Sequence, residues 1–301
     1  LVLVVISECT SVLVENVKCC KVPGAASSDG DSVCDIERNS FARDMENTRI
    51  ISILQYLIGI HVKSTTVEAL SAQDFPYVLL SELNCFVTRR SGSGDASPQY
   101  LAQLSNRLNL LHKYFTICPE VAMPRETLDS IWNLLHNAKS NKTSSGSGTN
   151  NERDVMFSFL KQFIPVDNSY VNNNYFNTSA VVAVTPDIDS SVYIYREMIC
   201  NPDMDWTKCN RESFDCFKAY YDYFESKQTT NSVACDGNSG SSTYRSGESI
   251  GVSTLWQILF HIRCEVSARQ AMLLILQTYD RFKQQVEGKQ SPGGLELLLG
   301  K

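Results

Sequence analysis

The stretch SPQYLAQLSNRLNLLHKYF, residues 97–115, decides the fold class that we expect for this chain. Its apolar residues recur every three or four positions: Leu101, Leu104, Leu108, Leu111 and Phe115. Side chains with this spacing share one face of an α-helix. Ser97 is a residue type that caps helices, and Pro98 suits the first helical turn, where a missing N–H costs no hydrogen bond. The stretch therefore predicts an amphipathic helix that buries one face.

The same helical spacing recurs along most of the chain. The further apolar stripes lie in residues 50–58, 77–87, 128–135, 156–163, 214–224, 253–261 and 267–284. Asn151 and Asn210 precede two of these stripes as candidate caps, and Pro165 ends one of them. In the last stripe we expect these side chains to point inward: Ala268, Ala271, Met272, Ile275, Tyr279 and Phe282. Because the only β-rich run is Val181 to Val184, we predict an all-α protein.

Polar stretches rich in Gly, Ser and Asn separate these stripes, at residues 90–97, 139–150, 167–179 and 228–247. Because these stretches can bury little apolar area, burial cannot offset the conformational entropy lost when they become ordered. We therefore expect exposed, partly mobile loops. The short link between the helix of residues 101–115 and that of residues 128–135 favours an antiparallel pair. Helix pairs separated by long polar insertions are typical of an irregular armadillo/HEAT-like α-solenoid, with a compact helical domain as the alternative.

We expect three regions along the chain. Residues 1–97 form an N-terminal helical segment that is partly irregular, residues 98–285 form the helical-repeat region with insertions near 139–150 and 228–247, and residues 286–301 form a polar, flexible tail. Since the chain opens with Leu1 rather than Met and its first apolar run lacks a basic lead-in, we expect a segment of a longer protein without a signal peptide.

Composition excludes several classes of protein. Hydrophobic residues make up 43% of the 301 residues and charged residues 20%, which is typical of a globular chain. The formal net charge of -6 gives no field that would attract nucleic acid or an anionic membrane. No window reaches the roughly 18 to 20 consecutive apolar residues of a membrane-spanning helix. We therefore expect a soluble chain that binds neither nucleic acid nor a membrane.

Eleven cysteines are too irregularly spaced for a disulfide framework, and no C-x2-C pair occurs for zinc. Cys118 and Cys264 lie among apolar residues, where a free thiol packs as a small hydrophobe. The pattern favours reduced thiols in the cytoplasm, with the nucleus as an alternative. We predict no metal and no cofactor.

Candidates for catalysis are few. Cys85, in Leu83-Asn84-Cys85-Phe86, has the faint context of a nucleophile, but it lies on a predicted helix without a nearby glycine to shape an oxyanion hole. The four histidines, His61, His112, His136 and His261, are isolated and favour packing or capping roles over that of a general base. We therefore predict no catalytic residue.

Binding motifs are equally sparse. Neither G-x-G-x-x-G nor G-x4-G-K-[ST] occurs, and the Gly/Ser runs at 91–94 and 144–148 are linker-like. The pairs Asp187 with Asp189 and Asp203 with Asp205 lack the ligand ladder of a calcium loop, which favours solvated turns. A cluster of aromatic residues favours core packing, with anchoring of a partner as the alternative. Its members are Tyr193, Tyr195, Trp206, Phe214, Phe217, Tyr220, Tyr221, Tyr223 and Phe224.

Two helical blocks carry a family resemblance. The first comprises residues 107–115, RLNLLHKYF, and residues 123–135, MPRETLDSIWNLL. The second comprises GVSTLWQI at 251–258, VSARQA at 266–271 and LQTY at 276–279. Together they resemble the helical-repeat region of the giant ubiquitin-specific proteases of the fat-facets type, over about residues 98 to 285.

The resemblance implies a parent protein that hydrolyses ubiquitin isopeptide bonds, with its catalytic cysteine in an Asn-x-Gly-Asn-Thr-Cys-Tyr box and its histidine in a Gly-His-Tyr context. Neither box occurs in this chain, because Asn84-Cys85-Phe86 lacks the preceding residues. Our leading hypothesis is therefore a non-catalytic scaffold segment of such a deubiquitinase, which binds its substrates or regulators. An unrelated helical-repeat adaptor and a small cysteine hydrolase built around Cys85 are the alternatives.

Overall fold

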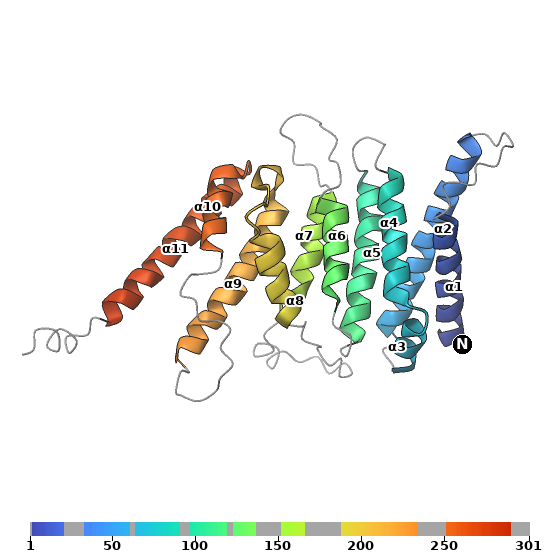
Figure 1. The fold of residues 1–301 in the computed structure, drawn as a ribbon, viewed down its shortest axis with the longest axis horizontal. Coiled ribbons are helices and arrows are strands. Elements are labelled where there is room, and N and C mark those ends of the chain that lie inside the picture. Colours follow the sequence, from blue (N-terminus) through green and yellow to red (C-terminus); the bar gives the residue numbers. More distant parts are fainter. Residues whose placement is uncertain are drawn as a thin grey trace, which may run out of the picture. The chain divides into compact units, whose positions relative to one another are not determined.

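Every ordered element in the described part of the chain is a helix. The computed structural model describes residues 2–20, 33–60, 64–90, 97–118, 123–136, 152–165, 188–233 and 251–289 (Figure 1). None of these residues lies in a β-strand, so the predicted all-α class is confirmed. The β-rich run at 181–184 lies outside the described residues, as do the polar stretches at 139–150 and 167–179.

The chain forms two compact units, one from Leu1 to Val192 and one from Tyr193 to Lys301. The helices up to the boundary are α1 (Val2–Cys20), α2 (Val33–Ile60), α3 (Ser64–Ser71), α4 (Phe75–Arg90), α5 (Pro98–Ile117), α6 (Arg125–His136), α7 (Glu152–Leu160), η1 (Lys161–Phe163) and α8 (Ile188–Tyr193). Those of the second unit are η3 (Ile194–Ile199), η4 (Trp206–Lys208), α9 (Arg211–Val233), α10 (Val252–His261) and α11 (Glu265–Lys289). The boundaries predicted at residues 97 and 285 stay predictions.

Helix α5 begins and packs as its sequence predicts. The Ser97 hydroxyl accepts a hydrogen bond from the Tyr100 N–H at 3.3 Å, and Pro98 occupies the first turn. All five residues of the predicted stripe are buried. The helix packs against α2, α4 and α7, which places it in the middle of the first unit.

The partner predicted for α5 is wrong. Helix α6 packs against α7 and α4, rather than side by side with α5. The physical reason is the narrow stripe of α6: Leu128, Ile131 and Leu135 are buried on one face. Helix α7 packs against α6, and the Phe157 ring of α7 meets Trp132 of α6 edge-on at 6.0 Å. A short link brings two helices near each other, but the position of their apolar faces determines which helices pack together.

The other predicted stripes of the first unit are largely buried. In α2, Ile50, Ile51, Leu54 and Ile58 are buried. In α7 and η1, the whole stripe from Met156 to Phe163 is buried ahead of Pro165, while the candidate cap Asn151 lies outside the described residues. In α4, Tyr77 is 66% exposed, because Phe75, Leu79 and Phe86 take the core positions instead.

A buried ion pair joins α4 to α5. The Arg107 guanidinium donates from Nε to Glu82 Oε2 and from Nη2 to Glu82 Oε1, both at 2.8 Å. Both side chains have 0% exposure. The guanidinium also lies 3.7 Å from the centre of the Phe86 ring, and Asn47 of α2 donates to Glu82 Oε1 at 3.2 Å. A charged pair, rather than apolar side chains, therefore lies where α2, α4 and α5 meet.

Two helices run further than the sequence predicts. Helix α9 continues to Val233, into the stretch at 228–247 that we predicted to be a loop, and α11 continues to Lys289. Neither extension contains a proline, the residue that would have ended the helix. Helices α1 and α3 lie in the predicted N-terminal helical segment but were not predicted individually, and α8, η3 and η4 were not predicted.

Candidate protein-binding surface

Helix α10 exposes two aromatic side chains on one face. Trp256 is 46% exposed and Phe260 is 73% exposed. One helical turn separates them, and their rings stack with centroids 5.9 Å apart. Exposed, preformed aromatic pairs are the groups that proteins most often use to anchor a partner.

The opposite face of α10 is held by the core of the second unit. Leu255 and Ile258 are fully buried and the Thr254 side chain is 1% exposed. At the start of the helix Gly251 adopts a left-handed conformation, with φ 99°, and lies against the hydroxyl of the buried Tyr195. This close contact fixes the position of the first turn of α10, so that Trp256 and Phe260 point outward.

Helix α11 buries a different face from the one we predicted. Its buried residues are Ser267, Ala271, Leu274 and Thr278. Met272 and Tyr279, which were expected inward, are 52% and 67% exposed. Of the predicted inward set only Ala271 is buried, Ala268 and Ile275 are half-buried, and the Phe282 side chain lies outside the described part. The reason is that apolar residues surround the middle of this helix, so periodicity alone could not select the buried face.

Contacts with α9 fix the orientation of α11. The Tyr221 and Thr278 hydroxyls lie 2.5 Å apart, and Arg281 forms an ion pair with Glu225 at 3.6 Å. Helix α11 also packs along α10. The outward face of α11 then carries five large apolar side chains: Val266, Met272, Leu273, Leu276 and Tyr279.

Cys264 stands at the start of α11, where its carbonyl accepts the hydrogen bond of the Ala268 N–H at 3.0 Å. Partial burial alone would raise the pKa of this thiol, but hydrogen bonds from Ser267 and Val266 outweigh it and lower the pKa. The prediction that Cys264 is a buried hydrophobe is wrong, because its side chain is only half-buried. Cys118 follows the prediction: it is buried, and burial raises the pKa of its thiol.

The predicted aromatic cluster forms the core of the second unit. Tyr195 stacks on Phe224 and Tyr220 with ring centroids 5.0 and 6.0 Å away, and Trp206 meets Phe217 edge-on at 6.0 Å. These rings are buried, as are those of Phe214 and Tyr221, which confirms the core interpretation for seven of the nine residues, whereas Tyr193 and Tyr223 are half-buried. The Asn210 side chain caps α9 as predicted, because its Oδ1 accepts from the Glu212 N–H at 3.0 Å. The large exposed aromatic pair of the second unit is instead on α10, at Trp256 and Phe260.

The histidines that the structure describes serve packing and helix ends. His112 meets the Phe163 ring edge-on at 4.9 Å, and burial lowers its pKa. His136 ends α6 and stacks on Trp132 at 4.6 Å, while His261 ends α10 and is exposed. His61 lies outside the described residues. Cys85 is half-buried in the middle of α4, as a helical cysteine.

Of the two acidic pairs, the structure describes both members only for Asp203 with Asp205, which lie in and beside an exposed turn. Asp205 accepts hydrogen bonds from the Thr207 N–H at 3.1 Å and pairs with Lys208 at 2.7 Å, and bonding to Lys208 and Thr207 lowers its pKa to about 2. Asp203 lies in the preceding exposed turn, Asp189 is exposed in α8, and Asp187 lies outside the described residues. In the described ranges no three His, Cys, Asp or Glu side chains gather in a way that could hold a metal ion.

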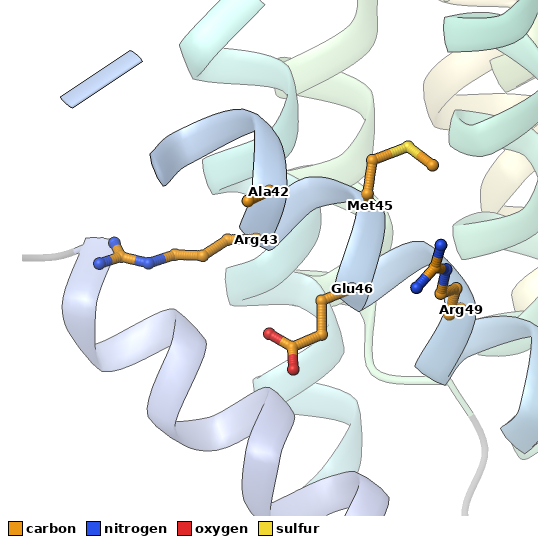
Figure 2. Close-up of a pocket in the computed structure, with 5 residues that line it drawn as sticks. All are labelled: Ala42, Arg43, Met45, Glu46 and Arg49. Carbon is orange, nitrogen blue, oxygen red and sulfur yellow. The ribbon is translucent and has the colours of Figure 1, made fainter. Parts of the chain in front are cut away.

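An open hollow on α2 is lined by Ala42, Arg43, Met45, Glu46 and Arg49. Figure 2 shows that their side chains spread along the helix and point in different directions. Glu46 already accepts a hydrogen bond from Asn16 of α1 at 3.2 Å. Small-molecule sites are concave, with polar groups that converge on the ligand, so this hollow does not qualify as one.

Comparison of the chain with protein-family models, curated proteins and solved structures finds no match. The described fold and surface therefore define only a class, that of helical proteins with exposed apolar helix faces. In the ranges that the structure describes, no helix has both the length and the apolar character needed to cross a membrane.

The exposed aromatic pair could have been predicted from the sequence, but we did not single it out. Trp256 and Phe260 lie four positions apart, a spacing that places two side chains on one helix face. Leu255, Ile258 and Ile262 occupy the other face. Both faces of the segment are apolar, and only the contacts with η4 and α11 decide which one is covered.

Proposed function

We propose that this chain is a non-catalytic helical scaffold that binds other proteins. The observation that carries the proposal is the stacked pair of Trp256 and Phe260, which the core of the second unit holds in an exposed position. Solvation of such a pair is unfavourable, and Trp is the most enriched residue at binding hot spots. The outward apolar face of α11 adds to the surface that a partner can cover.

We further propose that the parent is a giant ubiquitin-specific protease of the fat-facets type, in which isopeptide hydrolysis takes place elsewhere in the protein. The proposal rests on the resemblance of residues 251–258 and 266–279, the same segments that carry the exposed side chains. It includes an irregular armadillo/HEAT-like solenoid, which is supported by packing between helices close in sequence, such as α4 with α5 and α10 with α11. It also includes a cytoplasmic location, with the nucleus as an alternative.

Treatment of the purified chain with a ubiquitin thioester probe should leave it unlabelled. Cys85 lies in the middle of a helix, where backbone N–H groups are already used within the helix and cannot bind an oxyanion. The readout is the mass of the intact chain, with an active ubiquitin-specific protease as the positive control. Labelling of the wild-type chain that disappears in a Cys85→Ser variant would establish the hydrolase alternative instead.

Substitution of both exposed aromatic residues, Trp256→Glu with Phe260→Glu, should abolish capture of the partner. Each aromatic anchor contributes at least about 2 kcal/mol when it is a hot spot, which corresponds to roughly a 30-fold loss of affinity. The matched control is Tyr77→Glu, because Tyr77 is 66% exposed on α4 of the first unit. Capture is measured by quantitative mass spectrometry with the tagged full chain.

The identity of the captured proteins separates the two proposals. Ubiquitin-pathway proteins that bind the wild-type chain and the Tyr77→Glu control, but not the double variant, support the deubiquitinase scaffold. Membrane or cytoskeletal proteins with the same dependence support the unrelated adaptor. Equal capture by all three chains contradicts a binding role for Trp256 and Phe260.

A further inference from the structure

The outward face of α11 has the pattern of a helix that meets a second copy of itself. Apolar residues on both faces are typical of a helix that is covered on both. One face of α11 is covered by α9 and α10 through Ala271, Leu274 and Thr278. The other face exposes Leu273 by 58% and Leu276 by 49%, beside the still more exposed Tyr279. Among the residues that the structure describes, none buries this second face.

Six outward residues lie at the a and d spacing of a heptad: the apolar Val266, Leu273 and Leu276, and the charged Arg269, Asp280 and Lys283. Val266, Leu273 and Asp280 occur at every seventh position, and so do Arg269, Leu276 and Lys283. These two series form the seam that a neighbouring helix contacts in a coiled coil. The seam from Val266 to Lys283 is about 26 Å long at 1.5 Å per residue, which is enough for several layers of packed side chains.

The charges on this seam decide the direction of the neighbour. Arg269 and Glu265 are 77% exposed and form a surface ion pair at 2.5 Å, which water screens and a partner can share. Asp280 is exposed near the other end of the seam. A parallel copy would place Arg269 opposite Arg269 and Asp280 opposite Asp280. An antiparallel copy places Arg269 opposite Asp280 twice.

We propose that α11 mediates an antiparallel homodimer whose two-fold axis passes between Leu274 and Ile275. In this register Leu273 faces Leu276 of the second copy, and Arg269 faces Asp280 of the second copy. Val266 faces the aliphatic stem of Lys283, a contact that leaves the ammonium group in water.

The flanking residues match in the same register. Met272 lies beside Tyr279 of the second copy, where a thioether and an aromatic ring attract each other. Gln270 lies beside Gln277 of the second copy, so two amides meet rather than two like charges. A two-fold interface must be self-complementary, and every outward pair named here satisfies that condition. The inference goes beyond the proposed function, because it concerns contacts of the chain with itself.

Charge reversal in the full chain tests the register. Sedimentation velocity over about 1 to 100 µM should show that wild-type protein dimerises reversibly. Arg269→Asp and Asp280→Arg should each weaken the dimer about tenfold, because each creates two like-charge contacts per dimer. The double variant R269D/D280R should regain most of the affinity, since it restores opposite charges across the axis. Failure of the double variant to recover would overturn the proposed register.

Removal of the apolar centre tests the interface itself. Leu273→Glu with Leu276→Glu places four carboxylates at the axis and should leave only monomer at 100 µM. Both side chains are about half exposed in the single chain, so far-UV circular dichroism should show unchanged helix content. The control Tyr77→Glu should dimerise like the wild type. A wild-type chain that is monomeric at 100 µM, or a dimer that survives L273E/L276E, would overturn the proposal and assign this face to another partner.

Discussion

Replacement of Arg107 by methionine should lower the free energy of unfolding by about 3–5 kcal/mol. The loss is large because Glu82, with 0% exposure, would keep its place in the interior without its charged partner. The two hydrogen bonds of the ion pair, both 2.8 Å long, would be lost together with the contact of the guanidinium with the Phe86 ring. Urea unfolding of the full chain, followed by circular dichroism and by hydrogen exchange in α4 and α5, measures the change.

A second substitution separates the ion pair from packing. The double variant Glu82→Met with Arg107→Met should recover most of the lost stability, because two apolar side chains of similar volume remove both buried charges. Arg269→Met is the matched control, since Arg269 is 77% exposed and should change the stability by less than about 1 kcal/mol. If the single and double variants are equally unstable, the damage comes from lost packing rather than from an uncompensated charge.

Replacement of Gly251 by alanine should destabilise the second unit by about 2–5 kcal/mol. The left-handed backbone costs a residue with a side chain about 1–2 kcal/mol, and overpacking in a well-filled core adds about 1–3 kcal/mol. Overpacking is expected because a Cβ at Gly251 would lie 2.2 Å from the Tyr195 hydroxyl oxygen, and Tyr195 is fully buried. Thermal unfolding and hydrogen exchange in α10 measure the effect.

Two comparisons isolate the cause. Gly59→Ala should be neutral or stabilising by up to about 1 kcal/mol, because Gly59 is in a helix and its new Cβ would meet only the end of the flexible Lys113 side chain. Adding Tyr195→Phe to Gly251→Ala should recover part of the loss, since it removes the atom at 2.2 Å while the backbone strain remains. Simple additivity of the two substitutions would contradict the close contact.

The helices of single apolar stripes could be predicted from the sequence, and α5 shows why. Its apolar residues recur every three or four positions on a single face, so Leu104, Leu108 and Leu111 could face only the core. Ser97 and Pro98 marked its start. The helical spacing of the apolar residues in α9 likewise predicted that its aromatic side chains lie in the core. Helix α3 escaped prediction because eight residues are too few for a periodic signal to stand out.

The outward face of α11 could not be predicted in this way. Met272 and Tyr279 have the composition of core residues, yet the structure leaves them exposed. A periodic pattern states that a face is apolar, but not whether this chain or another molecule covers it. The contact of Tyr221 with Thr278, residues distant in sequence, rotates α11 and so decides which face remains outward.

The sequence by itself determined the all-α class, the position of most helices and their principal buried stripes, because these depend on spacing along a single segment. Only the tertiary structure decided the partners of α6, the ion pair of Glu82 with Arg107 and the outward faces of α10 and α11. Each of these depends on which two apolar or charged surfaces pack together. All segments of the unit compete for these contacts. Local periodicity contains no information about the outcome of this competition.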